Sequence, residues 1–330
     1  MILAGDIGGT NSRLAYFIVD GGNLQQVATE QFPSNQFASL REVVEKFTQM
    51  HRCQIERAAF GVAGPVEDGV SRPPNLDWIV DSRKLAEELG LQRVGLINDL
   101  VANAHGILAL NPDEFVTINE GQRDSSGNAA LISAGTGLGE AGLHWEGDHY
   151  HPFASEGGHA DFAPRNPVEM KMLSHAFQSH EHVSYEHFLS GPGLLNIYDF
   201  LSLSRTRPEP QWLQDEFEQA DRAAVISKVG LENRDDVCAR SLDMFISIYA
   251  AEAGNLALKV LATGGVYIGG GIAPKIIEKF KQPAFMDAFC AKGRMSSLMK
   301  SIPIKVIDND RTALLGAAQV AFSERGMSAG

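Results

Sequence analysis

In the first third of the chain, the spacing of apolar residues predicts short strands that alternate with helices. Apolar positions recur at helical spacing over residues 38–50, 80–89 and 100–110, and Asp81 is placed to cap the second of these helices. Short apolar runs predict strands over residues 2–4, 12–19, 24–31, 57–63 and 94–97. Alternation of this kind is typical of an α/β lobe.

The rest of the chain has a different pattern, in which helices dominate from Pro167 onward. A strand is expected over residues 129–133, followed by a hairpin whose arms, 141–145 and 150–153, flank the turn Glu146-Gly147-Asp148. Later helices are expected over residues 194–203, 236–261, 273–280 and 312–322, and later strands over 266–268 and 304–307. The length of 330 residues exceeds the usual size of a single core, so this change of pattern predicts two lobes.

Composition and charge narrow the class of protein. The formal net charge of −13 argues against binding to nucleic acid or to an anionic membrane. The first residues do not form a signal peptide, and no apolar run is long enough to predict a membrane span. The cysteines Cys53, Cys238 and Cys290 lack metal-ligand spacing, so we expect buried, reduced thiols in a cytoplasmic protein.

Three glycine-rich turns follow predicted strands. The first is Gly5-Asp6-Ile7-Gly8-Gly9-Thr10-Asn11, in which missing Cβ atoms let backbone N–H groups approach phosphate oxygens. Asp6 would then organise Mg²⁺, directly or through water. The alternative is an ordinary hairpin turn that needs glycine for its geometry.

The second turn, Gly135-Thr136-Gly137-Leu138-Gly139, leads into another strand. It therefore lacks the following helix of a dinucleotide fingerprint, and it lacks the Gly-Lys-Ser/Thr ending of a P-loop. The third turn, Gly269-Gly270-Gly271-Ile272, precedes a helix. A flat ligand such as a nucleoside would account for its glycines, and a loop crowded by helix–sheet packing is the alternative.

Polar residues that could hold an acceptor substrate form a second group. Asn98 and Asp99 lie at a predicted strand end, where ligands bind in α/β sheets, and Asp99 is the candidate general base unless it only caps the next helix. Glu156 and His159 flank two glycines and suit a polyhydroxylated ligand, although His159 could be purely structural. A metal site here is not expected, because no second histidine motif completes a ligand set.

Two further residues are ambiguous from spacing alone. Glu186 follows Ser184, which could cap a short helix, and that spacing favours a solvent-facing Glu186. Asn75 lies in a loop with Asp77 and Trp78 that is either a sugar contact or a surface turn.

Taken in order, seven segments carry a resemblance that covers nearly the whole chain. They are Gly5-Asp6-Ile7-Gly8-Gly9-Thr10-Asn11, Ile97-Asn98-Asp99, Gly135-Thr136-Gly137-Leu138-Gly139, Glu156-Gly157-Gly158-His159-Ala160-Asp161-Phe162, Leu189-Ser190-Gly191-Pro192-Gly193, Gly254-Asn255-Leu256-Ala257-Leu258 and Gly269-Gly270-Gly271-Ile272-Ala273-Pro274. In these segments the chain resembles the bacterial glucokinase family. No single motif is decisive, but the ordered series is specific.

The resemblance implies the two-lobe actin-like ATPase (ribonuclease H-like) fold with a nucleotide and sugar cleft. The smaller α/β lobe would comprise residues 1–109 and 309–330, and the larger α+β lobe residues 110–308. It also implies ATP, Mg²⁺ and a homodimer. Asp99 would be the base; the glucose ligands would be Asn75, Asn98, Asp99, Glu156, His159 and Glu186. The first two turns would hold the phosphates and Gly269 to Ile272 the adenosine.

A related family, the repressor–open-reading-frame–kinase proteins, typically carries a Cys-rich zinc motif after the Glu-x-Gly-His segment. Here that segment continues as Asp161-Phe162-Ala163-Pro164, so we expect no zinc. The resulting hypothesis is transfer of the γ-phosphoryl group of ATP to the 6-hydroxyl of glucose. The alternatives are a kinase for mannose, fructose or an N-acetylhexosamine, and a sugar or nucleotide sensor that transfers no phosphate.

Overall fold

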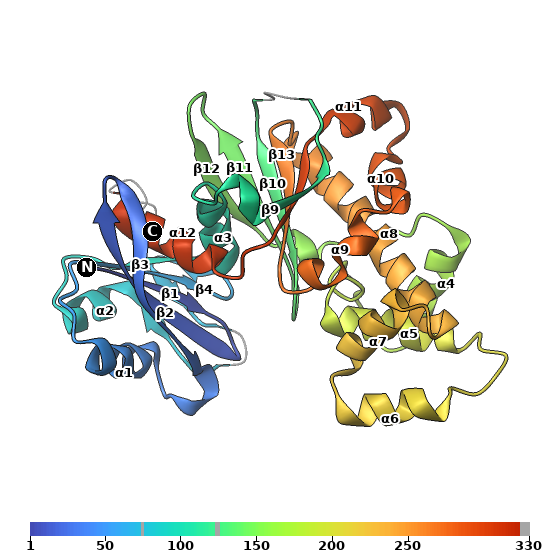
Figure 1. Cartoon of the computed structure of the whole chain (residues 1–330), viewed down its shortest axis with the longest axis horizontal. Coiled ribbons are helices and arrows are strands. Elements are labelled where there is room, and N and C mark those ends of the chain that lie inside the picture. Colours follow the sequence, from blue (N-terminus) through green and yellow to red (C-terminus); the bar gives the residue numbers. More distant parts are fainter. Residues whose placement is uncertain (74–75, 123–125, 324–330) are drawn as a thin grey trace. The chain divides into compact units, whose positions relative to one another are not determined.

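The computed structural model describes residues 1–73, 76–122 and 126–323, and its contacts divide the chain into two units (Figure 1). The first unit consists of Met1–Glu114, Pro152–Ala154 and Asn309–Gly330, and the second of Phe115–His151 and Ser155–Asp308. Among the described residues, the helices are all too short or too polar to cross a membrane.

The first unit is built on a sheet with the strand order β3-β2-β1-β4-β8. Its strands are β1 (Ile2–Ile7), β2 (Asn11–Asp20), β3 (Asn23–Pro33), β4 (Arg57–Val62) and β8 (Gly95–Asn98). β1, β2 and β3 form an antiparallel meander, whereas β1, β4 and β8 run parallel. The predicted strand at residues 2–4 is therefore longer than expected, because both neighbours of β1 pair with it as far as Ile7.

Helices cover both faces of this sheet. α1 (Leu40–His51) and α2 (Ser82–Leu89) share one apolar cluster with Leu3, Ile7 and Phe60. α3 (Asp99–Ile107) and α12 (Thr312–Phe322) share another with Ile2 and Ala4, which face the opposite way. Asp81 caps α2 as predicted, accepting hydrogen bonds from Arg83 and Lys84. A small separate sheet is formed by three two-residue strands, β5 (Val66–Glu67), β6 (Val70–Ser71) and β7 (Val80–Asp81).

The helix nearest the C-terminus, α12, lies beside strands from the start of the chain (Figure 1). Its contact with α3 brings backbone against backbone. A Cβ added at Gly316 would lie 1.7 Å from the carbonyl oxygen of Ala102, and one at Gly106 would lie 1.9 Å from that of Thr312. Glycine at both positions is therefore required for the helices to approach this closely.

The second unit is built on a sheet with the order β12-β11-β10-β13-β14-β9. Its strands are β9 (Phe115–Asn119), β10 (Ala129–Ala134), β11 (Leu138–Trp145), β12 (Tyr150–Ser155), β13 (Gly265–Gly269) and β14 (Ile304–Ile307). β10, β13 and β14 run parallel, and the predicted β11–β12 hairpin is confirmed. β9 was not predicted, since its residues are only partly buried and show little alternation.

Helices pack around the long helix α8 (Asp236–Val260). The others in this unit are α4 (Pro167–Ala176), α5 (Gly191–Ser202), α6 (Gln211–Gln219), α7 (Arg222–Leu231), α9 (Ile277–Phe280), α10 (Pro283–Cys290) and α11 (Ser296–Ser301). The buried Tyr249 of α8 donates a hydrogen bond to the carbonyl of Ile132 and accepts one from the amide of Ala134, each at 3.2 Å. This pair of bonds fixes the end of β10 to the helix.

The cysteines are free thiols. Cys238 and Cys290 are buried, as predicted. Cys53 is only half-buried, and its thiol donates to the carbonyl of His51, so the expectation of burial is wrong there.

We expect Gly316→Ala to lower the free energy of unfolding by about 1–3 kcal/mol, because the added methyl group must push α12 away from α3. Thermal and urea unfolding would measure this loss. The matched control is Gly271→Ala, where an added Cβ meets open space. Equal stability of the two variants would contradict the close packing of the helices.

Candidate active site

In the first unit, the parallel strands end side by side. Ile7 of β1 is in register with Val62 of β4, and Val62 with Asn98 of β8. Residues that follow these three strands therefore gather at one edge of the sheet, which is where α/β folds bind ligands. The edge carries the first glycine turn on one side and Asn98 with Asp99 on the other.

The first glycine turn is shorter than expected, because Gly5, Asp6 and Ile7 belong to β1. The turn proper is Gly8-Gly9-Thr10, closed by the amide of Gly8, which donates to the carbonyl of Asn11 at 2.9 Å. Ser34 anchors it, since its hydroxyl donates to the carbonyl of Gly8 at 2.7 Å and its amide donates to that of Thr10 at 2.9 Å.

Gly5 and Asp6 have different surroundings from those of the turn. A Cβ at Gly5 would lie 2.4 Å from the ring of Phe60, so this glycine makes room for core packing. Asp6 stands opposite Arg13 across the β1–β2 pair. Burial raises the pKa of the Asp6 carboxyl, and the guanidinium of Arg13 acts in the opposite direction.

Asn98 is the N-cap of α3, and Asp99 is the first helical residue. The side-chain oxygen of Asn98 accepts hydrogen bonds from the amides of Leu100 at 2.8 Å and Val101 at 3.3 Å, and its side-chain nitrogen donates to the carbonyl of Gly64 at 3.0 Å. Asp99 shares the amide of Leu100 through its own Oδ1, also at 2.8 Å. The cap position is thus Asn98, and Asp99 sits at the helix N-terminus, which favours a negative charge.

In the second unit, β10 and β13 also end side by side, with Ser133 in register with Gly269. The second and third glycine turns therefore meet. Gly270 has φ +85°, and a Cβ there would lie 2.2 Å from the carbonyl oxygen of Ala134. Gly135 and Gly271, by contrast, face open space, which leaves their backbone accessible to a ligand.

Glu186 joins the second turn to the polar cluster. Its Oε2 accepts a hydrogen bond from the amide of Leu138 at 2.8 Å, and its Oε1 lies 4.0 Å from Nδ1 of His159. A Cβ at Gly137 would lie 2.5 Å from the same Oε2, so glycine is needed for this approach. Local spacing, which favours a solvent-facing Glu186, does not predict this contact.

The local structure around Glu186 also differs from the expectation. Ser184 does not cap a helix; it forms an isolated β-bridge with Asp161, residues 185–189 form bends and turns, and α5 begins after its N-cap Ser190. The backbone of this segment pairs with the loop of Glu156 and His159 instead. The amide of Glu186 donates to the carbonyl of Gly158 at 3.0 Å, and that of Tyr185 donates to the carbonyl of Ala160 at 3.1 Å.

Glu156 and His159 lie at either end of a short 3₁₀ turn, Gly157–His159, and both side chains are exposed. Its glycines let the loop rest on β11. A Cβ at Gly158 would lie 2.1 Å from the carbonyl oxygen of Leu138, and one at Gly157 would lie 2.0 Å from Oε2 of Glu140. Asn75, the other predicted sugar contact, lies outside the described residues.

A buried pair of acids, Glu140 of β11 and Glu252 of α8, lies beneath this loop. Glu252 accepts hydrogen bonds from Asn255 at 2.8 Å and Lys259 at 3.2 Å, which stabilise its negative charge. Among the described residues, neither oxygen of Glu140 meets a donor. Burial, and then the charge of Glu252, raise the pKa of Glu140 to about 8, which favours a neutral carboxyl that can donate a hydrogen bond to Glu252.

The acid pair is connected to the loop by further hydrogen bonds. Asn255 donates to the hydroxyl of Tyr185 at 3.0 Å and accepts from Lys292. Tyr185 in turn holds the carbonyl of Ala160 through its amide. This network was not predicted, and its signal in the sequence is a pair of glutamates inside two otherwise apolar segments.

We expect Glu140→Gln to preserve the hydrogen bond to Glu252 while removing the titration. Because the folded pKa of Glu140 is raised, its contribution to wild-type stability is complete below the ordinary carboxyl range and is lost as the pH rises through the folded value. The free energy of unfolding of the variant therefore rises relative to that of the wild type, by roughly 1–3 kcal/mol between about pH 5 and about pH 9.

Thermal unfolding at several pH values would measure this difference. Glu252→Gln is the control, and it is expected to be less stable than the wild type because it removes the charge that Asn255 and Lys259 contact. Parallel curves for the wild type and Glu140→Gln would show that Glu140 does not hold a proton.

Comparison with known proteins places this geometry in a family. The family model described as Glucokinase matches residues 3–324. A glucokinase of Nostoc sp. (strain PCC 7120) is 39% identical over 337 residues, which cover 97% of this chain and 98% of the relative. The solved structure of a glucokinase from an Antarctic psychrotroph has a TM-score of 0.83 at 30% identity, covering 97% of this chain and 98% of that chain.

A more distant structure supports the fold alone. The ROK family glucokinase of Streptomyces griseus, solved with glucose and AMPPNP, has a TM-score of 0.66 at 19% identity. The match covers 97% of this chain and 99% of that chain. The predicted two-lobe actin-like ATPase fold is thereby confirmed. Since the family model and the relatives span nearly the whole length, the chain belongs to the glucokinase family.

Proposed function

We propose that the protein transfers the γ-phosphoryl group of ATP to the 6-hydroxyl of D-glucose, giving glucose 6-phosphate and ADP. The observation that carries this proposal is that Glu186 binds the amide of Leu138 at the second glycine turn and lies 4.0 Å from His159. We assign the phosphates to that turn and the sugar to the cluster around His159. The relatives named glucokinase support it.

The side chains assigned to the sugar offer the groups that a polyol needs. Glu156 and Glu186 provide acceptors, and His159 provides either a donor or an acceptor. Asn98 already uses both lone pairs of its oxygen and one N–H within the protein, so it has one N–H left for a sugar hydroxyl. Asn75 is proposed as a further ligand from the resemblance alone.

Asp99 is the proposed base. Phosphoryl transfer depends mainly on positioning and on charge stabilisation, but the attacking hydroxyl must lose its proton. A carboxylate held at the first position of α3, with its backbone fixed by the Asn98 cap, suits the acceptance of that proton. Asn98 thus orients Asp99 as well as contacting the sugar.

The glycine turns fit a bound nucleotide. Gly8-Gly9-Thr10-Asn11 and Gly135-Thr136-Gly137 would donate backbone N–H groups to phosphate oxygens, and Gly269 to Ile272 would lie along the adenosine. Open space at Gly135 and Gly271 agrees with this assignment. Mg²⁺ bound with ATP would neutralise phosphate charge, and Asp6 would hold its water shell. We further propose a cytoplasmic homodimer without zinc in the loop after His159.

A hexose panel tests the function. The protein is incubated with ATP, Mg²⁺ and glucose, mannose, fructose or N-acetylglucosamine, and sugar phosphate and ADP are quantified separately. We expect sugar 6-phosphate in step with ADP, fastest with glucose. A faster reaction with another hexose would identify a different hexose kinase, and binding of sugar without any product would identify a sensor.

We expect Asp99→Asn to lower kcat at least about 100-fold while glucose binding is largely retained, because a general base contributes about 10²–10⁴-fold. Steady-state kinetics and calorimetric glucose titration would measure the two effects. Asp113→Asn makes the same change at an exposed carboxylate and is expected to be fully active. Near-normal turnover of Asp99→Asn in a folded protein would exclude Asp99 as the base.

A further inference from the structure

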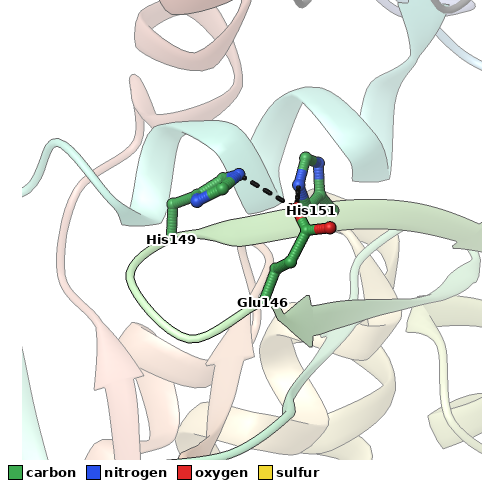
Figure 2. A group of neighbouring side chains, drawn as sticks. All are labelled: Glu146, His149 and His151. Carbon is green, nitrogen blue, oxygen red and sulfur yellow. Dashed lines mark hydrogen bonds and ion pairs between the residues drawn. The ribbon is translucent and has the colours of Figure 1, made fainter.

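The tip of the β11–β12 hairpin gathers Glu146, His149 and His151 (Figure 2). The amide of Glu146 donates to the carbonyl of His149 at 3.0 Å and closes the turn, in which Gly147 has φ +100°. His149 is the last residue of the turn and His151 is the second residue of β12, and the turn brings both side chains next to Glu146. Their rings meet edge to face with centroids 4.4 Å apart.

The potential ligand atoms converge on the carboxylate. Oε2 of Glu146 lies 2.5 Å from Nε2 of His151 and 3.3 Å from Nε2 of His149, as the dashed lines in Figure 2 show. One ligand atom from each residue can be chosen so that all lie within 4.8 Å of one another. Tetrahedral zinc with bonds of about 2.1 Å needs ligand atoms about 3.4 Å apart, so small rotations of exposed side chains would suffice.

His149 is prepared for coordination by its other neighbour. Its Nδ1 hydrogen-bonds to the carboxylate of Asp148. When Nδ1 donates to that carboxylate, the lone pair is left on Nε2, and this carboxylate–histidine arrangement is the usual support of a metal-bound imidazole. Nε2 is itself buried and makes no hydrogen bond within the part of the chain that the structure describes. A buried ring nitrogen whose neighbour at 3.3 Å is a carboxylate oxygen has a physical reason if a positive charge, a proton or a metal ion, lies between the two atoms.

We propose that Glu146, His149 and His151 bind a divalent transition-metal ion of the zinc class. Two imidazole nitrogens and one carboxylate oxygen are the ligands that such ions prefer, and the fourth position would be open to water. The site differs from that of the Mg²⁺ carried by ATP, which prefers oxygen ligands and keeps most of its water.

The hairpin gives this site a structural consequence. β11 begins at Leu138, whose amide binds Glu186, and β12 ends at Ser155, directly before Glu156. A metal ion at the tip would fix the register of the two strands that lead into the phosphate turn and the sugar loop. The expectation of no zinc was based on the segment after Asp161, and a metal at the hairpin would make that expectation wrong for the chain as a whole.

The test uses protein without an affinity tag, nucleotide or Mg²⁺, titrated with Zn²⁺ against a chromophoric chelator. We expect one Zn²⁺ per chain and a rise of the unfolding temperature with Zn²⁺. His149→Ala and His151→Ala should each weaken the affinity at least about tenfold, and Asp148→Asn by about tenfold through loss of the support of His149.

His180→Ala is the matched control, because it removes an exposed histidine whose ring meets another histidine ring edge to face elsewhere in the second unit. It should bind Zn²⁺ as the wild type does. Glu146→Gln keeps the shape of the turn and removes the charge, and circular dichroism without metal checks that each variant is folded. If the wild type does not compete with the chelator, or if all variants bind equally, the cluster is only a surface ion-pair network and the proposal is wrong.

Discussion

Parallel pairing between strands that are far apart in the sequence is the constraint on which the rest of the molecule depends. In the first unit it aligns the ends of β1, β4 and β8, and in the second the ends of β10 and β13. Each alignment brings loops from distant parts of the chain to one edge of a sheet. The aligned strands are mostly buried, so the polar groups that a ligand could reach are on those loops.

In the second unit, this arrangement brings together polar groups that contact more than one segment of the chain. Glu186 accepts a hydrogen bond from the amide of Leu138 at the second glycine turn and also faces His159. The loop of His159 rests on glycines that press against β11, and Glu140 fills the space below. A protonated acid is compatible with that space because it can donate to Glu252, whereas two neighbouring carboxylates would repel each other in a region of low dielectric.

The sequence was sufficient for features that depend on local patterns. Asp81 caps a helix where predicted, the hairpin turns at Glu146 to Asp148, and α12 spans the predicted residues 312–322. The extension of β1 through Ile7, the cap by Asn98 and the turn around Glu186 depend on partners distant in the sequence, so local spacing could not show them. The same holds for Glu140, whose partner Glu252 is on another element, and for His149 and His151, which Glu146 approaches only because the hairpin turns between them.

The position of α12 affects how the chain can be made. The sheet of the first unit is complete in sequence by Asn98, yet one of its faces is covered by a helix that begins at Thr312. During synthesis, more than two hundred residues must therefore be added after Asn98 before α12 is available to cover the apolar side chains of Ile2, Ala4 and Phe17. A chain interrupted before α12 would leave this apolar face partly exposed. Such a chain is prone to aggregation, so the face needs protection, for example by a chaperone, until translation is complete.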